Sequence, residues 1–192
     1  MLFVKNGHVK TMAGREFRNG CVLMDDNGKI AAVGENLDAP AGATVIDAQG
    51  RLVTPGVVEA HCHIGLDNEG IGWEGRDYNE IVDPITPQMR AIDSIYPQDE
   101  AFANAIAGGV TTACTGPGSA NVIGGTFVAI KLYGKRVDNM VVKNPLAMKC
   151  AFGENPKRCY GQGAKKSPMT RMAVAALLRE TLFRTKRYMQ DK

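Results

Sequence analysis

Two histidines at the end of a short apolar run constrain this chain most strongly. His61 and His63 follow the turn Pro55-Gly56 and the run after it. In an extended strand alternate side chains share a face, so both imidazoles point the same way and Cys62 points the other way. Two convergent neutral imidazoles supply half of a site for zinc, iron or manganese. The alternative is a strand end with two solvated histidines. Because the chain has only three histidines, this spacing favours the metal site.

Residues 1–54 have the pattern of short strands joined by turns. The pair Asn27-Gly28 separates the apolar runs 21–24 and 30–33. Asn-Gly accepts the positive φ angles of a type I′ turn, so we expect a β-hairpin there. Further short strands are expected within 45–54. The pattern predicts a small all-β unit.

After this unit the pattern changes to alternating strand and helix. Acidic residues within 97–100 open a helix, Gly108-Gly109 ends it, and an apolar strand follows at 110–114. Because this strand and the one that carries the histidines flank a helix, we expect them to be parallel. Strands are also expected at 127–132 and 146–152.

A last helix is expected to begin at Ser167-Pro168, which supplies a cap and a proline at the first helical position, and to run to about Met189. Its C-terminal part is basic. We interpret this part as a solvated helix face and not as a nucleic-acid patch, because no aromatic stacking residues are interleaved with the basic ones.

Four segments resemble the amidohydrolase superfamily. Pro55–His63 resembles its first barrel strand, and Ala107–Thr112 is similar to the join of its first helix and second strand. Pro117–Gly125 and Phe152–Arg158 are similar to the imidazolonepropionase-like branch. Glu59 departs from the pattern, since the superfamily more often has Asp there. The resemblance implies an α/β fold: part of a (β/α)8 TIM-like, metal-dependent hydrolase barrel, preceded by a small N-terminal portion of a β-sandwich.

Length limits how much of a barrel this chain can form. A complete eight-stranded barrel takes about 250 residues, and only about 135 follow Pro55. We therefore expect two regions, an N-terminal β-strand unit at 1–54 and the incomplete first part of a barrel at 55–192. The resembling enzymes are roughly twice as long, and their later strands carry further histidines and a catalytic aspartate. The resemblance thus implies that the general base lies outside this chain.

A protein-bound metal needs a third ligand, and no histidine follows the pair. Glu154 lies just past the strand expected at 146–152, where some amidohydrolases have a carboxylate ligand. Lys149 is the alternative, because two-metal members of the superfamily use a carboxylated lysine as a bridge. It lies mid-strand, however, and farther from the loop. Glu154 could also be a turn carboxylate paired with Lys157 or Arg158.

Two loops are candidates for substrate binding. The loop 65–96 is long for a compact domain and rich in Gly, Pro and acids, which is typical of a functional lid or a disordered segment. Its Trp73 either contacts substrate or staples the loop to the barrel rim. The glycine-rich loop 116–126 lacks the features of a nucleotide-binding loop. Its amides, with Ser119 and Asn121, could face a substrate carbonyl or carboxylate.

Composition is that of a globular protein, with 44% hydrophobic and 22% charged residues and a net charge of +3. The mild charge favours neither nucleic acid nor a membrane surface as a partner. Five scattered cysteines without a CxxC pair are typical of reduced thiols in a cytoplasmic protein, and the N-terminus lacks the features of a signal peptide.

Together these features predict a cytoplasmic, metal-dependent amidohydrolase. It would use metal-activated water, with zinc as the expected ion, to hydrolyse a non-peptide C–N bond in a cyclic amide or related substrate. The expected partners are a small-molecule substrate, the missing C-terminal half of the barrel, and further copies in a homo-oligomer. The isolated chain is expected to be inactive. The alternative is a non-catalytic truncated or split-gene fragment that acts as an assembly or binding module.

Overall fold

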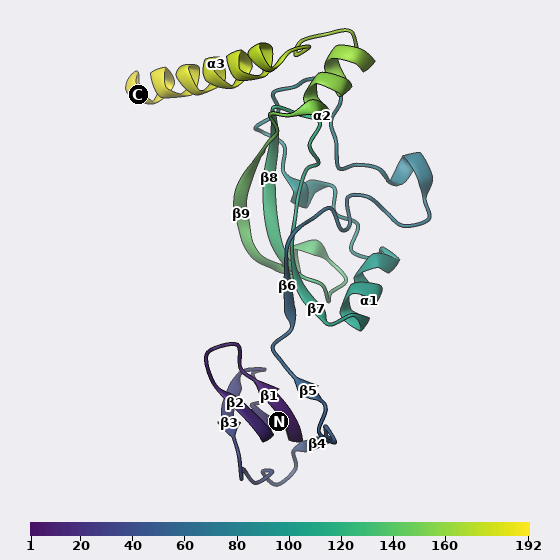
Figure 1. The fold of residues 1–192 in the computed structure, drawn as a ribbon, viewed down its shortest axis with the longest axis vertical. Helices are drawn as coiled ribbons and strands as arrows, with labels where there is room; N and C mark the ends of the chain where they lie inside the picture. Colours follow the sequence, from purple (N-terminus) through teal and green to yellow (C-terminus); the bar gives the residue numbers. More distant parts are fainter. The chain divides into compact units, whose positions relative to one another are not determined.

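A computed structural model describes all residues, 1–192, and shows a mixed α/β chain with two sheets (Figure 1). The chain divides into two compact units, Met1–Gly56 and Val57–Lys192. No helix is long and apolar enough to cross a membrane.

The first unit is a five-stranded sheet. Its strands are β1 (Leu2–Lys10), β2 (Glu16–Met24), β3 (Ile30–Gly34), β4 (Thr44–Asp47) and β5 (Leu52–Val53). The order is β3-β2-β1-β4, and β5 also pairs with β1. Neighbours β1, β2 and β3 are antiparallel, whereas β4 and β5 run parallel to β1. Phe3, Val9 and Cys21 form much of its buried interior.

The β2–β3 hairpin is confirmed, but the predicted turn type is wrong. Only Gly28 has a positive φ (71°), and its N–H donates to the carbonyl of Asp25. This is a type I turn followed by a left-handed glycine, which is typical of a slightly longer hairpin loop. The Asp25 carboxylate accepts from the backbone N–H groups of Asn27 and Lys29. These bonds stabilise this turn without a positive φ at Asn27.

The second unit contains a four-stranded sheet in the order β6-β7-β8-β9. The strands are β6 (Val57–Cys62), β7 (Val110–Thr115), β8 (Ile123–Lys131) and β9 (Val141–Cys150). Helix α1 (Glu100–Ala107) lies between β6 and β7 in the sequence, and these two strands are parallel as predicted. The Asp99 carboxylate caps α1 by accepting from Ala101 N–H, and the helix ends at Gly108.

The parallel arrangement does not continue into β8 and β9. Both are antiparallel to their neighbours, so the structure shows an open mixed sheet here and no closed barrel. The connections explain the reversal. A parallel pair needs a crossover of about a dozen residues or more, usually a helix. Residues 116–122 and 132–140 are shorter links, and only a single 3₁₀ turn, η3 (Val137–Asn139), lies in them.

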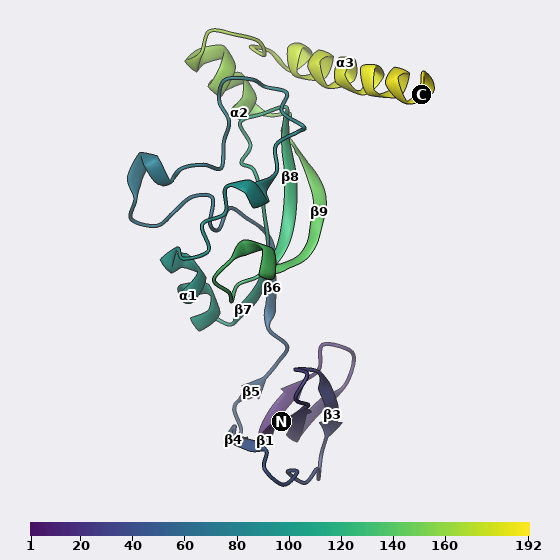
Figure 2. The ribbon, with the colours of Figure 1, turned by 180° about the vertical axis from the view of Figure 1, so that it is seen from behind.

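The two faces of this sheet differ. One face packs on α1 and the segment before it, through a core that includes Phe102, Ala113 and Val128 (Figures 1 and 2). Side chains alternate along a strand, so Phe127 of β8 lies on the opposite face, next to His61. The face away from α1 therefore carries the candidate site.

The long loop predicted between the first strand and α1 is ordered by contacts with the sheet. It contains two 3₁₀ turns, η1 (Gly72–Gly75) and η2 (Ala91–Asp93). Single β-bridges join Ile85 to Ile123 and Arg90 to Thr126.

After β9 the chain forms a short helix α2 (Glu154–Pro156), a π-helical segment η4 (Lys157–Gly163) and the long helix α3 (Arg171–Gln190). The prediction that the last helix begins at Ser167-Pro168 is wrong by a few residues. Thr170 is the N-cap, and its hydroxyl accepts from Ala173 N–H. Val174 is the only buried residue of α3, which extends alone in Figure 2.

Candidate functional site

The structure brings the two predicted histidine rings together at the C-terminal end of β6. The ring centroids of His61 and His63 are 5.6 Å apart, and the ring planes are nearly perpendicular at 82°. Cys62 points away from them and packs against the core on the α1 side. The third histidine, His8, contacts Glu16 in the first unit and is not part of this pair.

His63 is held in one orientation by two contacts. Its Nδ1 lies 2.7 Å from the carbonyl oxygen of Gly116, and its ring stacks on Tyr78 at a centroid distance of 5.4 Å. Because a carbonyl oxygen only accepts, Nδ1 carries the proton, and in the neutral ring Nε2 keeps its lone pair. A hydrogen bond of this kind commonly orients a metal-binding imidazole.

His61 has a cationic neighbour from a distant strand. Lys149 Nζ of β9 lies 3.4 Å from His61 Nε2. The His61 ring packs on Phe127 at 5.1 Å, and Lys149 Nζ lies 5.8 Å from the centroid of the same aromatic ring. Burial lowers the pKa of Lys149, and burial followed by the charges of Lys149 and His63 lowers the pKa of His61. Both shifts favour the neutral forms, which are the forms that donate an electron pair to a metal.

The preferred third ligand from the sequence, Glu154, lies in a different environment. Its two carboxylate oxygens are each 3.1 Å from Lys157 Nζ, and its side chain is 81% exposed. This is the turn pairing that the sequence left open as the alternative. No group of three or more His, Cys, Asp or Glu side chains is placed to hold a metal. The residue that the fold brings to the histidine pair is Lys149.

Lys149 stands out in the sequence as a charged residue within an otherwise apolar strand end. Lys149 is the penultimate residue of β9, between Met148 and Cys150, and the β8–β9 register places it across from Gly125. The neighbouring Gly124 leaves room for this side chain, since a Cβ there would lie 3.5 Å from Lys149 Cγ. This register was not readable from the sequence, because it depends on the antiparallel pairing of the two strands.

The three predicted substrate-binding residues have different environments. Ser119 lies with His63 in the wall of a pocket of about 470 Å³. Asn121 is buried, and its amide donates to the Asp83 carbonyl (2.8 Å) and the Thr86 hydroxyl (3.1 Å). It therefore joins the glycine-rich loop to the long loop. Trp73 is 82% exposed in η1.

The donor types at this place are ones that a divalent metal such as zinc accepts. An imidazole with a fixed Nδ1–H, a second imidazole and a lysine with a lowered pKa together offer nitrogen donors from β6 and β9. Imidazole nitrogen suits zinc, and a site with few protein ligands leaves positions open for water or substrate.

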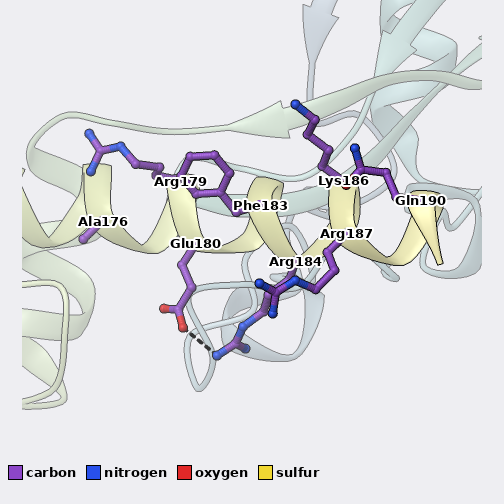
Figure 3. Close-up of a pocket in the computed structure, with 8 residues that line it drawn as sticks. All are labelled: Ala176, Arg179, Glu180, Phe183, Arg184, Lys186, Arg187 and Gln190. Atoms are coloured by element: carbon purple, nitrogen blue, oxygen red, sulfur yellow. Dashed lines mark hydrogen bonds and ion pairs between the residues drawn. The ribbon is translucent and has the colours of Figure 1, made fainter.

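Another hollow on the surface lies elsewhere and has a different character. It lies along one side of α3, and all eight residues around it come from that helix (Figure 3). The ion pair between Glu180 and Arg184 runs along the helix, and Phe183 lies beside Arg179. Because one helix cannot enclose a ligand, this hollow is the side of an unpartnered helix and not an active-site pocket.

The chain is similar in sequence and fold to known amidohydrolases. A crystal structure of an amidohydrolase from Thermotoga maritima MSB8 matches all of this chain with a TM-score of 0.94 and 44% sequence identity, over 49% of its own length. Amidohydrolase tasK of Hapsidospora irregularis is 38% identical over 168 residues, which is 80% of this chain and 17% of the relative. A dihydroorotase of Anaeromyxobacter dehalogenans is 33% identical over 117 residues, 61% of this chain and 22% of the relative. No protein-family model matches the chain.

The second unit is an α/β protein in which two histidines lie together at the end of a sheet strand. The chain belongs to the amidohydrolase superfamily. It spans about half the length of the Thermotoga structure and less than a quarter of the two curated relatives.

Proposed function

We propose that this chain is the N-terminal part of a metal-dependent amidohydrolase that hydrolyses a non-peptide C–N bond, in a cyclic amide or a related substrate. The observation that carries the proposal is the convergence of His61, His63 and Lys149 on one sheet face in a member of this superfamily. In this reading the strands of the second unit are the first part of a TIM-like barrel, and the first unit is part of a β-sandwich.

The metal, which we take to be zinc, would supply Lewis acidity and lower the pKa of bound water. The residues of this chain hold and orient it. His63 presents Nε2 because Gly116 fixes the Nδ1 proton. His61 presents Nε2 toward Lys149. Ser119, beside His63, supplies a hydroxyl that can bind a polar group of the substrate.

We propose Lys149 in place of Glu154 as the third ligand. Lysine is a ligand only in its neutral form or as a carbamate, and the lowered pKa of Lys149 increases the neutral fraction that either form requires. Glu154 would have to leave the ion pair with Lys157 to reach the histidines. The general base is proposed to come from polypeptide that corresponds to the other half of the relatives.

The cysteines, which are buried or half-buried, suit a reducing compartment. All five cysteines are free thiols in the structure, so we propose a cytoplasmic location. The proposed partners are a small-molecule substrate and the remaining part of the enzyme.

A second function, a non-catalytic assembly module, has one observation in its favour. Val57 and Val58 of β6 are 53% and 59% exposed on a strand that pairs on one side only. Such an edge is a template for association with another chain. The exposed edge of β6 is compatible with both functions, because the remaining part of an amidohydrolase would cover it as a partner of an assembly module would.

Metal content tests the proposed function. The chain is loaded with zinc, dialysed and measured by elemental analysis. The wild type is expected to retain stoichiometric zinc, and the double variant H61A/H63A is expected to retain none, because both imidazole donors are gone. K149A is expected to bind zinc weakly.

E154A is the matched control and is expected to bind like the wild type. Unchanged zinc in H61A/H63A would refute the site, and loss of zinc in E154A alone would restore Glu154 as the ligand.

A further inference from the structure

A pocket of about 470 Å³ opens beside His63. Its wall comes from the long loop, from the glycine-rich loop and from the segment after β9. We call it the Arg158 pocket, and the residues that matter here are His63, Asn79, Ser119, Asn155 and Arg158. Since His63 is one of its walls, a ligand in this pocket would lie next to the proposed metal site.

The Arg158 pocket carries positive charge and no negative charge. Arg158 is its only permanently charged residue, and no Asp or Glu is among the residues that line it. Arg158 forms no ion pair, whereas the adjacent Lys157 is paired with Glu154. The only polar contact of the Arg158 guanidinium is with Asn155 Oδ1, at 3.2 Å. A guanidinium keeps its charge at every physiological pH, so this cation lacks a counter-ion within the protein.

Neutral hydrogen-bond donors line the same pocket as the guanidinium. Asn155 accepts from Arg158 through its carbonyl oxygen, and Asn79 accepts the Ala120 N–H through its own. Each amide therefore has its NH₂ group left over for a ligand. The Ser119 hydroxyl is a further donor in the same wall. One cation with several neutral donors is a set suited to a singly charged anion with two oxygens.

The walls are held in place before any ligand arrives. The buried Tyr160 donates its hydroxyl proton toward the carbonyl oxygens of Glu80 (2.8 Å) and Asp83 (3.0 Å), which ties the segment after β9 to the long loop. Gly118 N–H donates to Tyr78 O at 2.6 Å, and a Cβ at position 118 would clash with Asn79. Binding in such a site costs little ordering of loops.

We propose that the Arg158 pocket binds a carboxylate group carried by the substrate, with Arg158 as the cation that recognises it. This inference rests on the proposed function, because it places the carboxylate beside the C–N bond that the histidine site would address. A substrate of this class is a cyclic amide with a carboxylate substituent. Arg158 is then a specificity-determining residue and makes no contact with the bond that breaks.

The test compares two probes that differ only in the carboxylate. L-pyroglutamate is a cyclic amide with a carboxylate, and 2-pyrrolidone is the same ring without it. Binding to the 192-residue chain is measured by ¹H–¹⁵N NMR, followed at the amides of Gly118 and Ser119, with and without zinc. The wild type is expected to bind pyroglutamate about tenfold or more tightly than pyrrolidone, since a charged hydrogen-bonded pair contributes roughly that ratio.

Variants then assign the preference to Arg158. R158Q is expected to lose the preference for pyroglutamate without changing the spectrum of the free protein, and R158K to keep part of it. R136Q is the matched control, because Arg136 is exposed and pairs with Asp138 outside the pocket. Equal binding of the two probes by the wild type, or a preference that survives in R158Q, would overturn the inference.

Two further arms separate the alternatives. If pyroglutamate is preferred without zinc while the chain fails to retain zinc, the carboxylate site stands and the proposed metal function fails. Inorganic phosphate is added as a competitor and is expected to displace pyroglutamate only weakly, because one cation matches one negative charge. Displacement by phosphate at concentrations below those of pyroglutamate itself would overturn the assignment to a carboxylate.

Discussion

At the scale of single residues, the site depends on how three neighbours act on His61. The ring packs on Phe127, lies 3.4 Å from Lys149 Nζ and is 5.6 Å from the His63 ring. Burial contributes most to lowering the pKa of His61, the charge of Lys149 comes next, and Glu59 opposes both. The same surroundings lower the pKa of Lys149 itself. The pair thus loses protons more readily than exposed side chains would, which favours metal binding over protonation.

A charge-removing substitution tests this coupling. We expect K149Q to raise the pKa of His61 toward its ordinary value, because one positive neighbour is removed while the ring stays partly buried. The shift is expected to be incomplete, since burial is the larger cause. An NMR titration of the His61 ring protons in zinc-free protein measures it. K143Q, on an exposed part of the same strand, is the control and should leave the titration unchanged. A His61 pKa that is the same in K149Q and the wild type would contradict the geometry.

At the scale of elements, Asp99 links the helix to the loop that precedes it. Its carboxylate caps α1 through Ala101 N–H at 3.0 Å and accepts from Asn68 Nδ2 at 3.0 Å. It also accepts from the Glu69 N–H, at 3.3 Å. The side chain is only 6% exposed. One buried carboxylate therefore accepts hydrogen bonds both from the long loop, at Asn68 and Glu69, and from the first turn of α1. These bonds hold the start of the long loop against the helix.

Removal of this carboxylate is expected to be costly. We expect D99A to lower the free energy of unfolding by roughly 2–3 kcal/mol, since it loses an N-cap and leaves buried donors without a partner. Urea denaturation followed by circular dichroism measures the change. E100A, one residue on in the exposed first turn, is the control and is expected to change stability by less than about 0.5 kcal/mol. Equal effects of the two substitutions would show that Asp99 acts only through its charge near the helix end.

At the scale of the whole molecule, both units expose apolar strand surface. In the second unit Val57 and Val58 are more than half exposed on β6. In the first unit Leu52 is 61% exposed, with Val45 and Ile46 close to one half. Monomeric proteins seldom leave contiguous apolar surface open. Together with the roughly half coverage of the Thermotoga structure, this supports the proposal that further polypeptide completes the enzyme.

The isolated chain is therefore expected to associate and to lack activity. Sedimentation velocity of the purified wild type should show dimers or larger species, because an unpaired strand edge pairs with another copy. V58K places a charge on that edge and is expected to shift the distribution toward the monomer. L182K, on the exposed side of α3, is the control for added charge alone. A wild-type monomer that hydrolyses cyclic amides unaided would overturn both the association and the placement of the general base outside the chain.

What the sequence determined by itself was local. The spacing of His61 and His63, the capped helix α1 and the β2–β3 hairpin follow from alternation, capping and turn residues within a few positions of each other. Only the tertiary structure decided that β8 and β9 run antiparallel, and so that Lys149 meets His61 while Glu154 pairs with Lys157. Strand direction and register depend on hydrogen bonds between distant segments and on whether a connection is long enough to cross over, so no pattern within one segment could reveal them.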